Sequence, residues 1–290
     1  MRKKFWTPYL FLLVPLLVYL VWVIGPMFYT FYLSLTKWDG LSQPIFIGLR
    51  NYQKLFRDPV FFISLTNNLK WIISFITIPV VLGLGLAVAL NRAIPGSKFF
   101  KASFYSPLVL SLVVCGLIWS WMYHPAKGLI NSVLRAVGLE ELAVGWLSNS
   151  DIVMWAIIAV AVWRQVGYVM VLYLAGLQSI DPSLIDASKV DGCSGVQTFR
   201  HVMLPLLAPV TVIVVVISVI DSLRAFDLVS VMTRGGPYNS SSVLANFMYI
   251  EAFNNYKMGY GASIATILFL ISMVFIFIYL SRVLKDEMEY

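Results

Sequence analysis

The sequence predicts an all-α integral membrane protein whose chain crosses the bilayer six times. Of its 290 residues, 60% are hydrophobic and 12% are charged, whereas soluble domains have about half apolar and roughly a quarter charged residues. The apolar residues gather in six runs, each close to the ~20 residues that a helix needs to cross the hydrocarbon. The runs cover 8–35, 68–91, 103–123, 151–177, 206–225 and 259–281, and we expect residues 1–290 to form a single transmembrane domain.

The first run follows Met1-Arg2-Lys3-Lys4, which resembles the start of a secretory signal peptide. The apolar core of a cleaved signal is only about 7–15 residues long, so we interpret this longer run as a retained first helix. Turn signals follow individual runs, with Asp39-Gly40 after the first and His124-Pro125 after the third. Several runs contain prolines, which are tolerated where neighbouring helices satisfy the freed carbonyl groups. This pattern favours a packed bundle.

The rare residues exclude several classes of protein. The two cysteines and two histidines are isolated along the chain, which argues against a disulfide framework and a metal site. The net charge of +7 comes from basic residues scattered among the loops, so it indicates attraction to membrane lipid rather than to nucleic acid. Segment 92–101 carries three basic residues, whereas the longer loop 36–67 carries four. The positive-inside rule then places the amino terminus in the cytosol.

A polar helical hairpin is predicted over 181–205, between the fourth and fifth runs. Asp181 followed by Pro182 is typical of a helix start, and Gly192 is typical of the position just past a helix end. These signals predict a helix over about 182–191. Ser194 and Gln197 have the spacing of a capping box, which predicts a second helix leading into the fifth run. From the residues alone, the hairpin is either a simple connector or a contact surface outside the bilayer.

The hairpin also resembles a family motif. Asp186-Ala187-Ser188, two residues, Asp191-Gly192-Cys193, five residues, Phe199, and then Leu204-Pro205 are similar to the EAA loop of permease subunits in maltose-type carbohydrate ABC importers. The family form has Glu at position 186 and Ala at 188 and 193, so the differences are small. The resemblance extends over most of the chain, to segments 35–39, 51–52, 163–167, 174–178, 233–237 and 259–262.

This resemblance implies a type I importer-like permease bundle in the cytoplasmic membrane of a prokaryote. It also implies a second permease subunit in a heterodimer, two ATP-binding subunits and an extracytoplasmic solute-binding protein. The chain contains no Gly-Lys dipeptide and therefore no Walker A site, so we expect ATP and Mg²⁺ on the partner subunits, and no cofactor or catalytic residue here. By analogy the ATPase-coupling surface comprises Asp186, Ala187, Ser188, Asp191, Gly192, Cys193, Phe199, Leu204 and Pro205.

Polar side chains within the fourth and fifth runs are candidates for a solute pathway, because such groups are costly inside a membrane. They could hydrogen-bond a polyhydroxylated solute, and the resemblance places Tyr168, Ser218 and Ser222 at positions that line the family's sugar site. The alternative is that Arg164 and Asp221 pair with each other, or with a partner subunit, and only hold helices together. The candidates are Arg164, Gln165 and Tyr168 in the fourth run and Ser218, Asp221 and Ser222 in the fifth.

These inferences predict a permease subunit that imports a sugar, an oligosaccharide or a related polyol. A cationic Arg164 would also suit a sugar phosphate or polyol phosphate. The alternative function is an ion-coupled carrier acting without an ATPase, with Arg164, Asp221 and Arg224 as coupling groups. A membrane enzyme is disfavoured, because the sequence has no His-Glu metal pattern and no plausible nucleophile–base–acid set. Residues 235–239 predict an outer turn, which is either only a turn or a contact for the external binding protein.

Overall fold

The computed structural model describes residues 7–91 and 95–288, and most of them are helical. By its internal contacts the chain divides into two compact units. The first unit extends to Phe62 and also includes Phe247–Val274. The second comprises Ile63–Asn246 and the described residues from Phe275 onward. Three helices pass from one unit into the other, namely α4 (Pro59–Leu90), α14 (Leu244–Tyr249) and α15 (Met258–Met288).

The first unit contains the amino-terminal helices and a short β-hairpin. Its strands are antiparallel, with Thr36 opposite Phe46. The side-chain amide of Asn51 donates to the main-chain oxygens of Ser34 and Thr36, each at 2.8 Å, and so fixes the hairpin to the helix that follows it. The elements are α1 (Thr7–Tyr19), η1 (Leu20–Ile24), α2 (Gly25–Ser34), β1 (Thr36–Lys37), β2 (Ile45–Phe46), α3 (Arg50–Leu55) and η5 (Ile250–Asn254).

The start of α15 packs against β1 and the residue that follows it. The amide of Gly259 donates to the carbonyl of Trp38 at 3.2 Å, and a Cβ at position 259 would collide with the carbonyl of Thr36. Glycine is therefore required for this close approach. The structure thus brings together three segments that the sequence resemblance singled out, at 35–39, 51–52 and 259–262.

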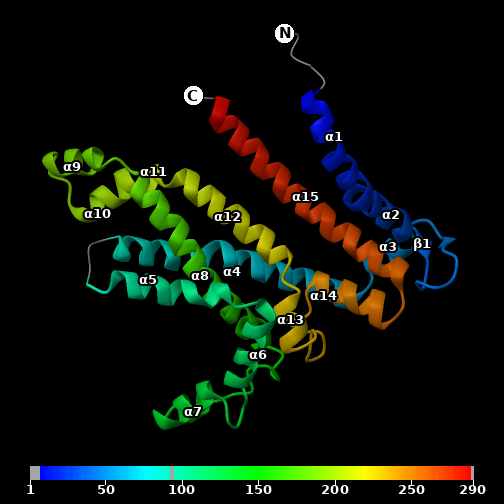
Figure 1. Ribbon diagram of the computed structural model, residues 1–290. Helices are drawn as coiled ribbons and strands as arrows, with labels where there is room; N and C mark the ends of the chain where they lie inside the picture. The colour runs from blue at the N-terminus through cyan, green and yellow to red at the C-terminus, as the bar shows by residue number, and fades with distance from the viewer. Residues whose placement is uncertain (1–6, 92–94, 289–290) are drawn as a thin grey trace. The chain divides into compact units, whose positions relative to one another are not determined.

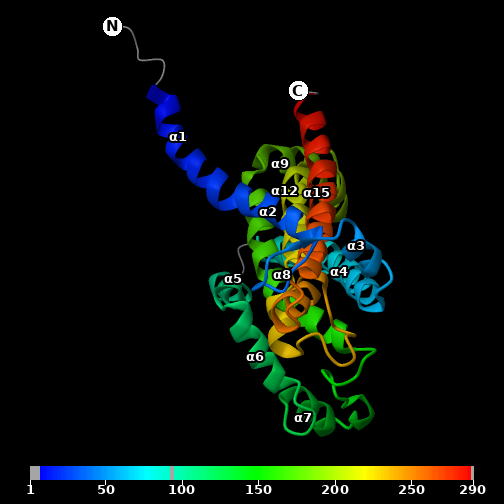
Figure 2. The ribbon, with the colours of Figure 1, turned by 90° about the vertical axis from the view of Figure 1, so that its right-hand side faces the viewer.

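The second unit is built around the long helix α8, which crosses α12 (Figure 1). Figure 2 shows α7 at the far end of α6. The elements are α5 (Ser97–Tyr105), η2 (Ser106–Val109), α6 (Leu112–Met122), α7 (Leu129–Ala136), η3 (Glu140–Leu142), α8 (Val153–Ser179), α9 (Pro182–Val190), α10 (Gly195–Thr198), η4 (Phe199–Met203), α11 (Leu204–Leu206), α12 (Ala208–Leu223) and α13 (Asp227–Met232).

The apolar core of the second unit follows α8. The apolar window of this helix is 61% buried, compared with 33% for α4. One cluster surrounds its first half, with Ile157 packed among Trp71 and Val229, and a second surrounds its later half, with Met170 near Leu207. Side chains placed on α8 are therefore held by packing on several sides.

The membrane-crossing segments differ from six continuous helices. Within the described residues, four helices are long and apolar enough to cross a bilayer, covering Phe11–Ser34, Pro59–Leu90, Val153–Ser179 and Met258–Phe277. The runs expected at 103–123 and 206–225 lie in bent helix pairs, with angles of 102° between Ser97–Val109 and Leu112–Met122 and 65° between Gly195–Leu206 and Ala208–Met232. The chain therefore crosses up to six times only if each bent pair counts as one crossing.

Local chemistry explains both bends. Leu110 and Ser111 are extended, with ψ angles of 140° and 151°, and the Ser111 side chain caps α6 by accepting from the amide of Val114. In the second pair Pro209 has no N–H to donate to the carbonyl four residues earlier, and Leu207, two residues before it, forms a turn between α11 and α12 with φ −83° and ψ −1°. The six-helix expectation counted apolar residues and overlooked the cap at Ser111.

Candidate functional site

The polar hairpin after α8 has a closely fixed first helix. The Asp181 carboxylate accepts from the amide of Ser183 at 2.9 Å, so the N-cap expected from the sequence is confirmed. This hydrogen bond lowers the pKa of Asp181 below its usual value. At the other end Gly192 has a φ of +78° and donates to the Lys189 carbonyl, while Cys193 donates to the Ser188 carbonyl. These two bonds form a Schellman motif, which satisfies the last carbonyls of α9.

The second helix of the hairpin begins as the sequence predicts. The Ser194 amide donates to the Gln197 side chain at 2.7 Å, and the Gln197 amide donates to the Ser194 hydroxyl at 3.4 Å, so the capping box is confirmed. The hydroxyl groups of Ser188 and Thr198 hydrogen-bond at 3.0 Å, and both residues are 6% exposed. This buried pair joins α9 to α10.

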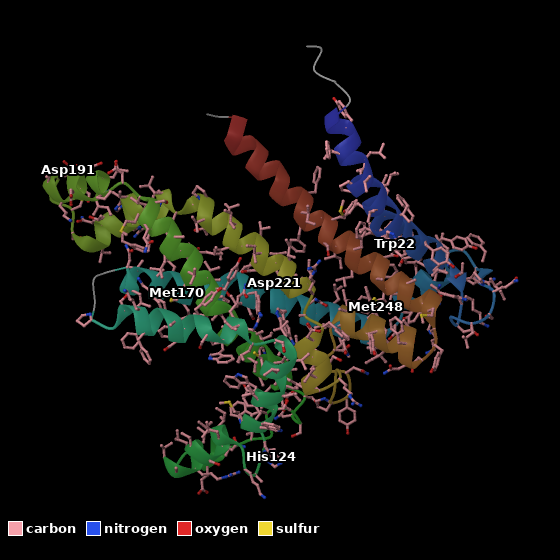
Figure 3. The ribbon with its side chains drawn as sticks, in the orientation of Figure 1. Trp22, His124, Met170, Asp191, Asp221 and Met248 are labelled. Atoms are coloured by element: carbon pink, nitrogen blue, oxygen red, sulfur yellow. The ribbon has the colours of Figure 1, made fainter. Side chains whose placement is uncertain are left out.

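The structure separates the residues assigned to the coupling surface. Asp191 lies at the outer end of the hairpin in Figure 3. Ser188 and Thr198 hold the hairpin together from inside, so Ser188 belongs to its interior and not to its contact surface. Exposed are Asp186, Ala187, Asp191, Gly192, Leu204 and Pro205, whereas Cys193 and Phe199 are partly buried.

Two apolar side chains of the hairpin were missed by the sequence analysis. Val190 is 87% exposed and Val196 is 77% exposed, on either side of the Gly192 corner. Exposed apolar groups on an otherwise polar surface are typical of a protein contact. The signal was present in the sequence, as two valines flanking a predicted glycine turn. The Lys189–Asp186 ion pair nearby is exposed and adds little stability.

Arg164 hydrogen-bonds the main chain of another helix segment. Its guanidinium group donates to the main-chain carbonyls of Leu110 at 3.3 Å and Leu108 at 3.2 Å. Helix ends leave such carbonyls without partners, and these two lie at the break between η2 and α6. The ion pairs within the described part of the chain are Lys189–Asp186 and Lys257–Glu251. Arg164 and Asp221 therefore do not form the ion pair that we considered as an alternative.

The other pathway candidates connect α8 with α12. The Gln165 amide, 3% exposed, donates to the Asp221 carboxylate at 3.4 Å, and Figure 3 places Asp221 near the end of α12. Ser218 and Ser222 are fully buried; Ser222 donates to the Val219 carbonyl, whereas the Ser218 hydroxyl has no hydrogen-bond partner among the described residues. Tyr168 is half-buried on α8. Ser218 is thus the candidate whose hydrogen-bonding capacity is free.

A polar seam between α4 and the loop before α14 was not anticipated. The Asn67 amide donates to the carbonyls of Ser240 and Ser242, at 2.8 and 2.9 Å, and the Ser64 hydroxyl donates to the Ser242 hydroxyl at 3.0 Å. The Asn68 side chain accepts from the Leu244 amide at 2.8 Å. The predicted turn at 235–239 is therefore part of a loop held at its base, and Tyr238 near its tip is 92% exposed.

Comparison with known proteins identifies the family. A model of the family described as binding-protein-dependent transport system inner membrane component matches residues 5–290. The chain belongs to this family. It is a membrane permease component, and its type I importer-like fold, expected from the sequence, is confirmed.

Relatives of this permease component span its whole length. It is 38% identical over 290 residues to a protein of Pyrococcus horikoshii described as a probable ABC transporter permease protein, covering 99% of each chain. It is 34% identical over 281 residues to a protein of Thermoanaerobacterium thermosulfurigenes described as a probable starch degradation products transport system permease protein, covering 97% of this chain and 95% of that one. Both comparisons leave no large segment of the permease unmatched.

A solved structure confirms the fold. A chain of the bacterial alginate ABC transporter, in complex with alginate pentasaccharide-bound periplasmic protein, superposes with a TM-score of 0.84 at 20% identity. The match covers 96% of the permease and 93% of that chain. As a member of this family, the permease works with a second permease subunit, an extracytoplasmic binding protein and separate subunits that hydrolyse ATP. The ion-coupled carrier that we weighed against this reading has no support.

Proposed function

We propose that this permease imports a sugar, an oligosaccharide or a related polyol. The observation that carries the proposal is the full-length relative described as transporting starch degradation products. The site supports an uncharged solute over a phosphorylated one, because Arg164 already donates to two main-chain carbonyls. The free hydroxyl of Ser218 and the half-buried Tyr168 supply hydrogen-bonding and aromatic groups suited to a polyhydroxylated solute.

The hairpin formed by α9 and α10 couples ATP hydrolysis to transport. Its Schellman motif, capping box and Ser188–Thr198 bond make it a rigid lever. Ile185 of α9 and Met203 of η4 pack against the core cluster that contains Leu177 of α8 and the buried Leu207 before α12. Movement of the hairpin is therefore transmitted through this packing to α8 and α12, which carry the candidate solute groups.

The ATPase contact lies on the exposed corner of the hairpin. It comprises the acidic Asp186 and Asp191 with the apolar Val190 and Val196. We expect ATP and Mg²⁺ to bind to the partner subunits rather than to this chain. The positive-inside distribution supports a cytosolic amino terminus, and the same topology puts the hairpin in the cytosol, where the ATPase is.

The test uses the complete transporter in proteoliposomes, with ATP inside and the binding protein outside. We expect uptake of radiolabelled maltodextrins or maltose that needs both, with little uptake of sugar phosphates. Val190→Asp with Val196→Asp should abolish uptake, because a charge would be buried in the ATPase contact. Val133→Asp on α7, a matched apolar site 52% exposed, should leave ATPase coupling intact.

Three results would contradict the proposal. Uptake driven by an ion gradient without ATP would favour the carrier. Uptake confined to sugar phosphates would reject an uncharged solute. Full ATPase coupling in the Val190 and Val196 variant, with normal membrane insertion, would remove the hairpin from the contact.

A further inference from the structure

A basic cavity lies beside α3 in the first unit. It has a volume of about 460 Å³ and is lined by Arg50, Gln53, Lys54, Arg57 and Asp58. Arg50, Gln53 and Lys54 follow the i, i+3, i+4 spacing of one helical face, and Arg57 lies in the turn just after α3. The opposite side of α3 is anchored by Asn51, through its two bonds to α2 and β1, and by Leu55, which is completely buried. The fold therefore fixes the orientation of the basic face.

The three cations of this face form no ion pair with any carboxylate among the described residues. Neither of the ion pairs found among the described residues involves Arg50, Lys54 or Arg57. Lys54 lies 4.3 Å from the ring centroid of Tyr260. A cavity with three cations and one carboxylate favours an anionic occupant.

The single carboxylate of the cavity is already engaged. Asp58 accepts a hydrogen bond from the Tyr260 hydroxyl at 2.8 Å through one oxygen and from the Val60 amide at 2.9 Å through the other. Both bonds fix Asp58 at the start of α4, so it serves to position the cavity wall. Among the described residues it forms no ion pair with the arginines, and its single charge leaves the cavity with a net positive charge.

The location of the cavity suits a lipid headgroup. α3 lies in sequence between the end of α2 and the start of α4, both of which belong to membrane-crossing segments. Leu49 and Phe56, which flank the basic face along the chain, are 63% and 54% exposed. Cations interspersed with exposed apolar side chains are typical of segments that lie in the interfacial layer of a bilayer.

We propose that this cavity binds the phosphate of an anionic phospholipid headgroup. Arg50 and Arg57 bind the phosphate oxygens, for which the guanidinium fork is well suited, and Lys54 adds a third positive charge. Leu49 and Phe56 contact the adjoining acyl region. The proposal rests on residence in the membrane, which the family establishes, and is independent of the solute transported.

The test is a lipid titration of the purified transporter complex in detergent, followed by native mass spectrometry. Each Lys or Arg near an anionic membrane surface contributes about fivefold in affinity. Arg50→Gln with Arg57→Gln should therefore weaken phosphatidylglycerol binding about 25-fold and leave phosphatidylcholine binding unchanged. The matched control is Lys37→Gln with Lys127→Gln, which removes two exposed cations outside the cavity and should leave phosphatidylglycerol binding at the wild-type level.

Other outcomes would overturn the proposal. Equal effects of the two double variants on phosphatidylglycerol binding would show that the lipid is attracted by the general positive charge and not by this cavity. Inorganic phosphate that binds as tightly as phosphatidylglycerol, and displaces it, would identify a free phosphate site. Unchanged lipid binding with weakened docking of the external binding protein would assign the cavity to a protein contact. Because lipid binding is measured without transport, a failure here is distinct from a failure of the solute assignment.

Discussion

Replacing Gly192 with alanine isolates the backbone requirement of the coupling hairpin. Gly192 has a φ of +78°, and a Cβ built there would meet no atom within 4 Å. The substitution therefore causes no steric collision, and its cost is the strain of an L-residue in the left-handed region, about 1–2 kcal/mol. That cost acts against the Schellman motif, whose two hydrogen bonds hold the end of α9.

The expected magnitude follows from this strain. A change of about 1–2 kcal/mol shifts a local opening equilibrium by roughly 5- to 30-fold. Amide hydrogen exchange at Asp191, Gly192 and Cys193 should accelerate by that factor in Gly192→Ala. Stimulation of ATPase activity by the loaded binding protein should fall in the same variant, because a frayed α9 transmits less of the movement.

Two controls separate strain from side-chain size. Gly195 lies outside the positive-φ region, and a Cβ there also meets nothing, so Gly195→Ala should match the wild type in both assays. Gly192→Asn should retain most of the coupling, since asparagine tolerates the left-handed conformation. The reasoning is refuted if Gly192→Ala exchanges and couples like the wild type, or if Gly195→Ala has an equal effect.

Three further predictions concern bonds that the structure describes. Ser188→Ala should lower the local stability of the hairpin by about 1 kcal/mol and speed exchange in α9 and α10, and unchanged exchange would contradict the role given to the Ser188–Thr198 bond. Arg164→Gln should lower the thermal midpoint of the complex, since one exposed and one part-buried carbonyl at the helix break lose their donor, at a cost of about 1 kcal/mol; an unaltered midpoint with lost transport would instead indicate direct solute contact. The lowered pKa of Asp181 means that its cap contributes above the unfolded pKa of 3.8 and is lost as pH falls through the lower folded value; protection factors in α9, corrected for intrinsic exchange, should therefore fall in acid, and Asp181→Asn should remove that pH dependence of the protection.

Local signals predicted the hairpin accurately. Asp181, Gly192 and the Ser194–Gln197 pair act within four residues of themselves, so their chemistry is readable from sequence spacing. The long helices were also predictable, because their lengths follow from runs of apolar residues. The bend near Ser111 could have been predicted, because Ser111 is an N-cap residue four positions after Pro107. It was missed because the residues on both sides belong to one apolar run.

Long-range partners could not be predicted in the same way. Asn67 bonds to residues more than 170 positions away, and Arg164 bonds to carbonyls 54 and 56 positions away. Neither sequence spacing nor residue type identifies such partners, since main-chain carbonyls occur at every position. The pairing of Arg164 with Asp221 was an inference from charge alone. In the structure Arg164 donates to main-chain carbonyls, and Asp221 accepts from the Gln165 side chain.

The length of α4 links the polar seam at its start to the thickness of the bilayer. Its 32 residues extend for about 48 Å, compared with a hydrocarbon layer of about 30 Å. Its first turns, with Ser64 and Asn67, therefore need either a tilted helix or a position beyond the acyl chains. Both side chains are buried and hydrogen-bonded to the loop. In long-chain lipids, opening these bonds would expose the polar groups to hydrocarbon at a high cost, whereas in short-chain lipids water could replace the broken bonds. Acyl-chain length thus becomes a control on how firmly the 233–243 loop is held.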